Sequence, residues 1–228
     1  AMLVSAAVCA DAQKFVTYKE AKDPVAVSER SVSAWKEVGK LQAQWVSADS
    51  LYSRSEVPVE RGVKVRLLEG WKGERVSAQF LLWTGAGADG VKLSVKDFIS
   101  EGGKMSSDIA QARFVRYTLS DKGGRDCRCE RGPLHEAQLV PDMIDTLKVF
   151  NMDPQTVRPV WITINIPRTA ESGTYRSEVV VSAKGAKKIK SASDNFDAVV
   201  DLLCVFKQNN KDRALQHLIA AHHGELEY

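Results

Sequence analysis

The chain has 228 residues, of which 44% are hydrophobic and 27% are charged, and its formal net charge at pH 7 is +3. This composition is typical of a globular protein with one sizeable core, and it excludes a disordered or collagen-like chain. The small positive excess comes with no basic helix and no aromatic motif for stacking bases, so we expect no nucleic-acid partner. No apolar stretch is long enough to make the chain transmembrane.

The first twelve residues differ from the rest of the chain. Residues 2–9 are short, apolar and mostly small, and Ala10-Asp11-Ala12 fits the A-x-A pattern of a signal-peptide cleavage site. We therefore expect residues 1–12 to be a signal-peptide remnant and Gln13 to be the mature N-terminus. The protein would then be exported, to the periplasm or the cell surface. A native N-terminal strand is the alternative.

From residue 13 onward, short runs of alternating apolar and polar residues predict β-strands. These runs lie at residues 41–45, 63–67, 76–82, 91–95 and 115–119. Gly70-Trp71-Lys72-Gly73 and residues 85–90 are typical of turns. Residues 120–138 read as a long charged loop, and residues 140–147 fit either a helical turn or an extended segment.

The clearest pattern is a strand, a turn and a second strand between residues 160 and 183. Apolar residues share one face of the first strand, Pro167 ends its hydrogen-bonded ladder because it has no N–H, and Gly173 suits a tight turn. The second strand returns apolar residues to one face, at Tyr175, Val179, Val181 and Ala183. We predict that residues 13–190 form a mainly β domain, an antiparallel β-sandwich of the immunoglobulin or jelly-roll type, with almost no helix before residue 139.

Beyond Lys190 the apolar spacing becomes helical. Ser193-Asp194 offers an N-cap, and a second helix can begin at Asp212. The apolar face of the first helix would consist of Phe196, Val199, Val200, Leu203 and Phe206. We predict that residues 191–228 form a short C-terminal helical tail, which packs on the sandwich or self-associates with a second copy of the chain.

The cysteines and histidines do not form a recognisable metal site. Cys127 and Cys129 make a C-x-C pair, but with His135 they supply only three of the four ligands of structural zinc. The pair fits two free thiols or a strained disulfide. Three further histidines lie at spacings that do not share a helical face: His217, His222 and His223. We expect no metal and no cofactor, and we expect Cys204 to pack as a small hydrophobe.

Two other groups are candidates for chemistry or binding. Asp142 and Asp145 are a carboxylate pair, but their spacing is generic and we expect both to be solvated. The indole of Trp71, in a turn, could stack on a sugar ring, contact another domain or pack over the sandwich edge. The other tryptophans are expected in the core: Trp35, Trp45, Trp83 and Trp161.

The stretch from Pro167 to Tyr175 follows the pattern P-x-x-A-x-x-G-x-Y and is followed by alternating valines. It resembles the last hairpin of the N-terminal β-sandwich domain of bacterial glycoside hydrolases of the family 123 type. Three further segments agree with that family in order, at residues 71–84, 114–121 and 139–145. The chain departs from it at Ser177, where glycine is frequent, and after Lys190, where another strand and then a catalytic barrel would begin.

The resemblance implies a non-catalytic accessory domain that packs on a catalytic barrel. The acid and assisting carboxylates of that family lie on the barrel, so no catalytic residue is carried over to this chain. The alternative is a free-standing carbohydrate-binding module that holds a glycan with Trp71. A small hydrolase that uses Asp142 and Asp145 is a third hypothesis.

Overall fold

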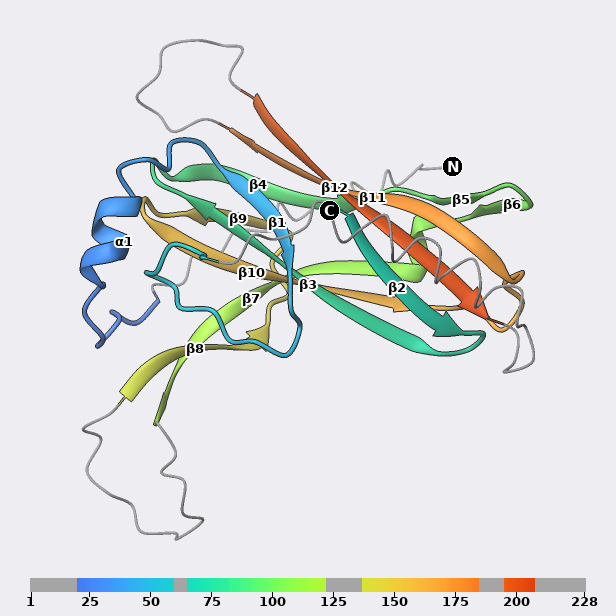
Figure 1. The fold of residues 1–228 in the computed structure, drawn as a ribbon, viewed down its shortest axis with the longest axis horizontal. Coiled ribbons are helices and arrows are strands. Elements are labelled where there is room, and N and C mark those ends of the chain that lie inside the picture. Colours follow the sequence, from blue (N-terminus) through green and yellow to red (C-terminus); the bar gives the residue numbers. More distant parts are fainter. Residues whose placement is uncertain (1–19, 60–64, 122–136, 185–194, 208–228) are drawn as a thin grey trace, which may run out of the picture.

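The computed structural model describes residues 20–59, 65–121, 137–184 and 195–207. Two β-sheets pack face to face and enclose one hydrophobic core (Figure 1). The prediction of a mainly β, antiparallel sandwich is confirmed.

The first sheet is antiparallel throughout. Its strands, in spatial order, are β1 (Gln42–Val46), β3 (Arg75–Thr84), β10 (Thr156–Asn165), β7 (Ala110–Asp121) and β8 (Ala137–Ile144). The strands predicted at 41–45, 76–82, 115–119 and 160–166 are therefore confirmed. Residues 140–144, which the sequence left open between helix and extended chain, belong to β8.

The second sheet contains one parallel pair. Its order is β2 (Val65–Trp71), β12 (Asn195–Lys207), β11 (Gly173–Lys184), β4 (Ala88–Val95) and β9 (Val149–Met152). The pairing of β12 with β2 is parallel, and the other neighbours are antiparallel. A hairpin of β5 (Phe98–Ser100) and β6 (Gly103–Met105) attaches to β11.

Helix is scarce in the described part of the chain. The helix α1 (Glu29–Ala34) begins at Ser28, whose side chain accepts a hydrogen bond from the Ser31 N–H, a normal N-cap. A single 3₁₀ turn, η1, spans Ser107–Ile109. None of the described helices is long and apolar enough to cross a bilayer.

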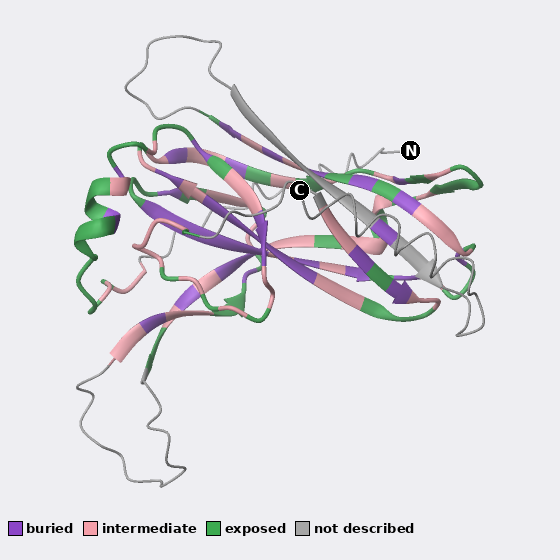
Figure 2. Ribbon diagram, viewed as in Figure 1, coloured by how far each residue is buried: buried purple, intermediate pink, exposed green. Residues whose placement is uncertain are grey.

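The core forms because alternate residues of facing strands point inward. In β10 these are Val160, Ile162 and Ile164, and all three are fully buried. Buried and less buried positions alternate along β11 and the second half of β10, whereas β3 and the first half of β10 carry unbroken buried runs (Figure 2). A second, smaller cluster lies on the outer face of the first sheet, where Trp35 beside α1 covers Leu81 and Val157.

The predicted helix at residues 196–206 is wrong, because these residues form β12. The sequence supports both periods, since every second residue from Phe196 to Phe206 is apolar, in addition to the helical series. Cys204, one of the alternating series, is fully buried in the core, as predicted for that cysteine. Two strands with free edges, β11 and β2, flank β12, and their ladders outweigh a lone helix that would be marginal in water.

Candidate functional site

Trp71 lies at a corner where the chain crosses from one sheet to the other. It is the last residue of β2 and is partly buried. Its N–H donates to the Glu74 carboxylate at 2.6 Å, and its C=O accepts from the Glu74 N–H at 2.9 Å. Gly73 adopts φ +82°, a conformation that favours glycine at the third position of such a turn. The turn predicted at residues 70–73 is thus present, displaced by one residue.

This corner is held against the segment that links the sheets after β10. The Gly73 N–H donates to the Ile166 C=O at 2.9 Å, and the Ile166 N–H donates to the Glu74 C=O at 2.8 Å. Lys207, the last residue of β12, pairs with Trp71 in the parallel register. The last described strand therefore ends beside Trp71.

The structure separates the two carboxylates that the sequence singled out. Asp142 is exposed on β8. Asp145 is buried, and its Oδ2 accepts from Nε and Nη2 of Arg116 at 3.2 and 3.1 Å. The expectation that both are solvated is therefore wrong for Asp145. An exposed carboxylate and an ion-paired one do not form a matched acid and base.

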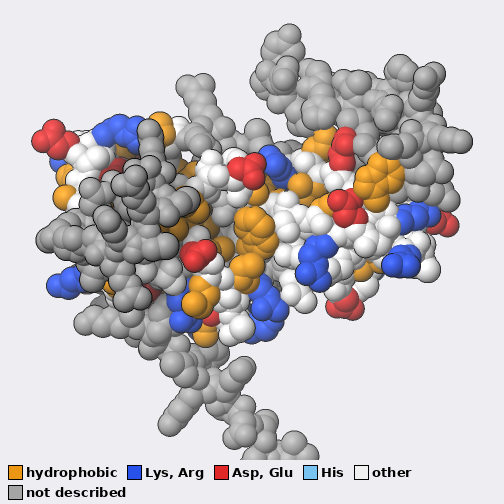
Figure 3. Space-filling model, turned by 90° about the horizontal axis from the view of Figure 1, so that it is seen from below, with side chains coloured by type: hydrophobic (Ala, Val, Ile, Leu, Met, Phe, Trp, Pro, Cys, Tyr) orange, Lys and Arg blue, Asp and Glu red, His pale blue; other side chains and the backbone are white. Residues whose placement is uncertain are grey.

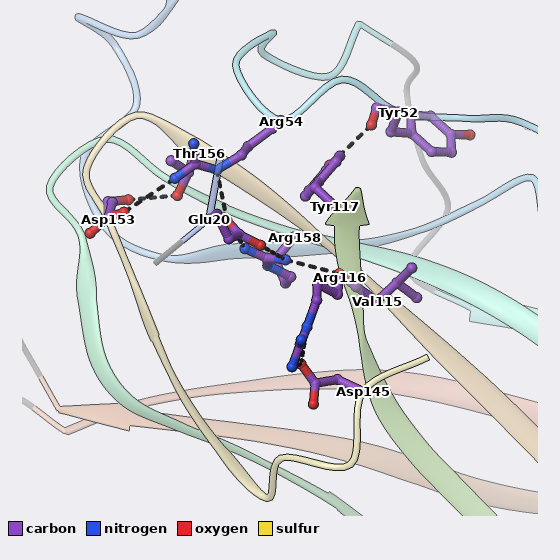
Figure 4. Close-up of polar contacts among 10 residues, drawn as sticks. All are labelled: Glu20, Tyr52, Arg54, Val115, Arg116, Tyr117, Asp145, Asp153, Thr156 and Arg158. Carbon is purple, nitrogen blue, oxygen red and sulfur yellow. Dashed lines mark hydrogen bonds and ion pairs between the residues drawn. The ribbon is translucent and has the colours of Figure 1, made fainter. Parts of the chain in front are cut away.

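The strongest polar cluster, which the sequence analysis missed, is built on Arg158 of β10 (Figure 4). Arg158 is 2% exposed, and its Nη1 and Nη2 lie 2.7 Å from Oε1 and Oε2 of Glu20 respectively. Arg54 joins the same carboxylate at 3.0 Å and reaches the Asp153 carboxylate at 3.2 Å. The two contacts between Glu20 and Arg158 fix the segment before α1 to the first sheet.

Pro159 leaves a backbone carbonyl of β7 without a ladder donor, and Arg158 supplies one. The β10–β7 register ends at Val160 opposite Phe114, so the next position places Pro159 opposite Val115. Pro159 has no N–H to donate to the Val115 carbonyl. Nη1 of Arg158 donates to that carbonyl at 3.0 Å instead.

Aromatic rings close the cluster. The guanidinium carbon of Arg158 lies 4.3 Å from the ring centre of Phe150 and 5.1 Å from that of Tyr117, distances at which cation–π attraction operates. The Tyr117 hydroxyl donates to the Tyr52 carbonyl at 3.0 Å, and burial raises the pKa of Tyr117 well above its usual range. The cluster is buried and mutually paired, so it stabilises the fold and offers no cation to a ligand.

Two hollows indent the described surface. One, of about 690 Å³, lies between the β5–β6 turn and the start of β11, and Glu101, Glu171 and Arg176 contribute to it. The other, of about 340 Å³, lies beside β7 and is lined in part by Arg113 and Lys148. Among the residues whose placement is described, no three His, Cys, Asp or Glu side chains are grouped closely enough to hold a metal ion.

Several residues singled out in the sequence lie outside the described residues. These are residues 1–12, Cys127, Cys129, His135 and the second predicted tail helix from Asp212 onward, with His217, His222 and His223. Of the tryptophans expected in the core, Trp35 and Trp45 are buried, and Trp83 packs partly buried against the smaller cluster. Trp161 is only partly buried, and it lies on the face of β10 opposite to its core residues.

This geometry defines a β-sandwich of two twisted sheets, in which the chain crosses between the sheets at the Trp71 corner. Its described part contains no assembled catalytic group. A family model described as the glycoside hydrolase 123 N-terminal domain matches residues 45–183. The chain belongs to this family of N-terminal domains.

One solved structure agrees at the level of the fold. A family 123 glycoside hydrolase from Clostridium perfringens, studied for glycolipid glycan hydrolysis, matches 74% of this chain at 22% identity with a TM-score of 0.60. The match spans 27% of the length of that enzyme. The PapD-like domain 7 of human CEP192 matches 85% of this chain and 98% of its own, at 12% identity and a TM-score of 0.37. No curated protein sequence matches the chain.

Proposed function

We propose that this sandwich is a non-catalytic accessory domain that docks on the catalytic domain of a family 123 glycoside hydrolase. The observation that carries this proposal is the end of β12 beside Trp71. Because Lys207 and Trp71 are paired at one corner, a polypeptide that continues after β12 starts next to Trp71, which is partly buried. Tryptophan is enriched where one protein surface packs on another.

The role assigned to Trp71 in this proposal is contact with the catalytic domain. Its backbone is fixed by Glu74, and the turn is fixed by Ile166, so the indole is presented from a rigid corner. A rigid anchor loses little conformational freedom on binding, which favours its use in an interface. Contact with a sugar would not require this corner to coincide with the end of β12.

Trp71→Ala is expected to weaken docking and leave the domain folded. The chain would be titrated by calorimetry with a family 123 catalytic domain from the same source. Truncation of one interface anchor is expected to cost about 2 kcal/mol of binding free energy, roughly thirtyfold in affinity. Arg176→Gln, on an exposed residue of β11 away from the corner, is the matched control. Equal affinity of Trp71→Ala and the unmodified chain would assign Trp71 to packing alone.

Residues 1–228 are expected to show no glycosidase activity on aryl glycosides, including N-acetylhexosaminides. Glycoside hydrolysis needs an acid aimed at the leaving oxygen and a second group across the sugar. Asp145 is committed to Arg116, and Asp142 stands on the solvent side of β8. Turnover that survives repurification and disappears in Asp142→Asn would instead establish the small-hydrolase hypothesis.

Export to the periplasm or cell surface is part of the same proposal. It is supported by the apolar, small-residue stretch and the A-x-A pattern ahead of Gln13. N-terminal sequencing of the periplasmic fraction is expected to begin at Gln13. Recovery of a protein that still carries Met2 from that fraction would contradict the cleavage.

A further inference from the structure

The outer face of the first sheet is covered only in part. Trp35 and the segment that contains Tyr52 and Val57 lie over Leu81 and Val157. The cover ends at Gln79, whose side-chain amide donates to the carbonyls of Ser47 and Ser50 at 3.0 and 3.2 Å. Beyond Gln79, toward the other end of β3 and β10, the outward residues are exposed or only partly buried.

Strand register places a defined set of side chains on that part of the outer face. In β10 the core residues are Ile162 and Ile164, so Trp161, Thr163 and Asn165 point outward. Trp161 stands opposite Arg113, and Asn165 stands opposite Arg75. We call this set the Trp161 face; it comprises Arg75, Gln111, Arg113, Trp161, Thr163 and Asn165.

The chemistry of the Trp161 face is that of an aromatic platform bordered by planar polar groups. Neighbouring strands are about 4.8 Å apart, and alternate residues are about 6.7 Å apart along a strand, so the face measures on the order of 10 by 13 Å. Among the described residues, no hydrogen bond of the Trp161 indole N–H is found. No aliphatic side chain belongs to the set, unlike the apolar centre of a protein interface.

The two arginines carry charge that no described carboxylate neutralises. Nε of Arg75 donates to the Asn165 side-chain carbonyl at 2.8 Å, and Nη2 of Arg113 donates to that of Gln111 at 3.1 Å. Both partners are neutral amides, which orient the guanidinium groups without neutralising their charge. An anion is therefore the complementary ligand, and guanidinium groups bind carboxylate and sulfate oxygens in a planar, two-point manner.

We propose that the Trp161 face binds an acidic oligosaccharide. The indole would stack on the apolar face of one sugar ring, Gln111, Thr163 and Asn165 would exchange hydrogen bonds with hydroxyl groups, and Arg113 or Arg75 would bind a carboxylate or sulfate. A sugar chain lying flat on the sheet would make the ring stacking, the hydroxyl hydrogen bonds and the contact with an arginine at the same time. Figure 3, which views the molecule from below, shows hydrophobic, charged and polar side chains mixed over the described surface.

The test is an NMR titration of the full chain with three tetrasaccharides. Tetragalacturonate supplies carboxylates, its methyl ester keeps the rings and removes the charge, and a heparin-derived tetrasaccharide supplies sulfates. Amide shifts are expected at residues 111–113 and 161–165 with one or both anionic probes, with a dissociation constant on the order of 1 mM, since the site is open and has one stacking ring. The methyl ester is expected to bind about tenfold more weakly, because it loses the charge-assisted hydrogen bonds.

Variants separate the contributions of stacking and charge. Trp161→Ala and Arg113→Gln are each expected to weaken binding about tenfold. Trp161→Phe should retain most of the affinity. The matched control is Arg176→Gln, for an exposed arginine on the outer face of the second sheet, and it should bind normally. Melting temperatures confirm folding, and Arg113→Gln tests the site if Trp161→Ala does not fold.

The proposal is overturned if neither anionic tetrasaccharide shifts these amides at about 10 mM, roughly ten times the expected dissociation constant. Equal binding of the methyl ester would remove the role of the arginines and also overturn it. If the sugars do not bind but Trp161→Ala abolishes association with a family 123 catalytic domain, the face is a domain contact. That result would leave the accessory-domain proposal standing and reject the sugar site.

Discussion

Replacing Arg158 by alanine is expected to lower the free energy of unfolding by about 3–5 kcal/mol, because it leaves a buried carboxylate without its main partner. Glu20 and Arg158 have side chains that are 6% and 3% exposed and lie 2.7 Å apart. The substitution also removes the only donor described for the Val115 carbonyl opposite Pro159. Urea unfolding followed by tryptophan fluorescence would measure the change.

Asp153→Ala is the control for this prediction, because it removes the exposed arm of the same cluster. Asp153 is 77% exposed, so loss of its contact with Arg54 is expected to cost less than about 1 kcal/mol. The double variant Glu20→Leu with Arg158→Met should recover part of the loss, since it removes both buried charges but still leaves Val115 without a donor. Equal stability of Arg158→Ala and Asp153→Ala would show that the buried pair does not fix the fold.

Ending the chain at residue 194, before β12, is expected to abolish cooperative folding. β12 lies between β11 and β2, and it is the strand through which β2 joins the second sheet. Its removal exposes one edge of β11 along Gly173–Lys184, detaches β2 and takes Cys204 out of the core. Exposed strand edges of this length promote aggregation. Circular dichroism and solution mass would report the loss.

A chain that ends after Lys207 is the control, since it keeps each described strand. It is expected to melt cooperatively, whereas the chain that ends at residue 194 should not. This differs from the sequence-based interpretation, in which residues 191–228 were an added helical tail on a complete sandwich. A cooperative transition and an unchanged monomeric mass for the shorter chain would restore that interpretation.

The sandwich could be predicted because alternation along a strand needs only local sequence. The pattern at Val160, Ile162 and Ile164 identified one face of β10, and that face is the core. Residues 196–206 could not be assigned in the same way, because apolar residues satisfied a helical and a strand period together. The neighbours that decide between them, β11 and β2, are brought beside β12 only by the fold.

The polar features were harder to predict for the same reason. Glu20 and Arg158 are separated by 138 positions, so their pairing is invisible in any local window. A signal was present, because Arg158 interrupts an apolar run next to Pro159 and a buried charge requires a partner. Trp161 was expected in the core as an apolar residue in a strand, but its odd position in β10 places it on the outer face.

Hydrogen–deuterium exchange of this domain, alone and joined to a family 123 catalytic domain from the same source, tests docking at the Trp71 corner most directly. We predict slower amide exchange in the joined protein at residues 68–75 and 166–168, with little change at the β5–β6 turn on residues 100–103. Identical exchange of the Trp71 corner in the two proteins would contradict the account.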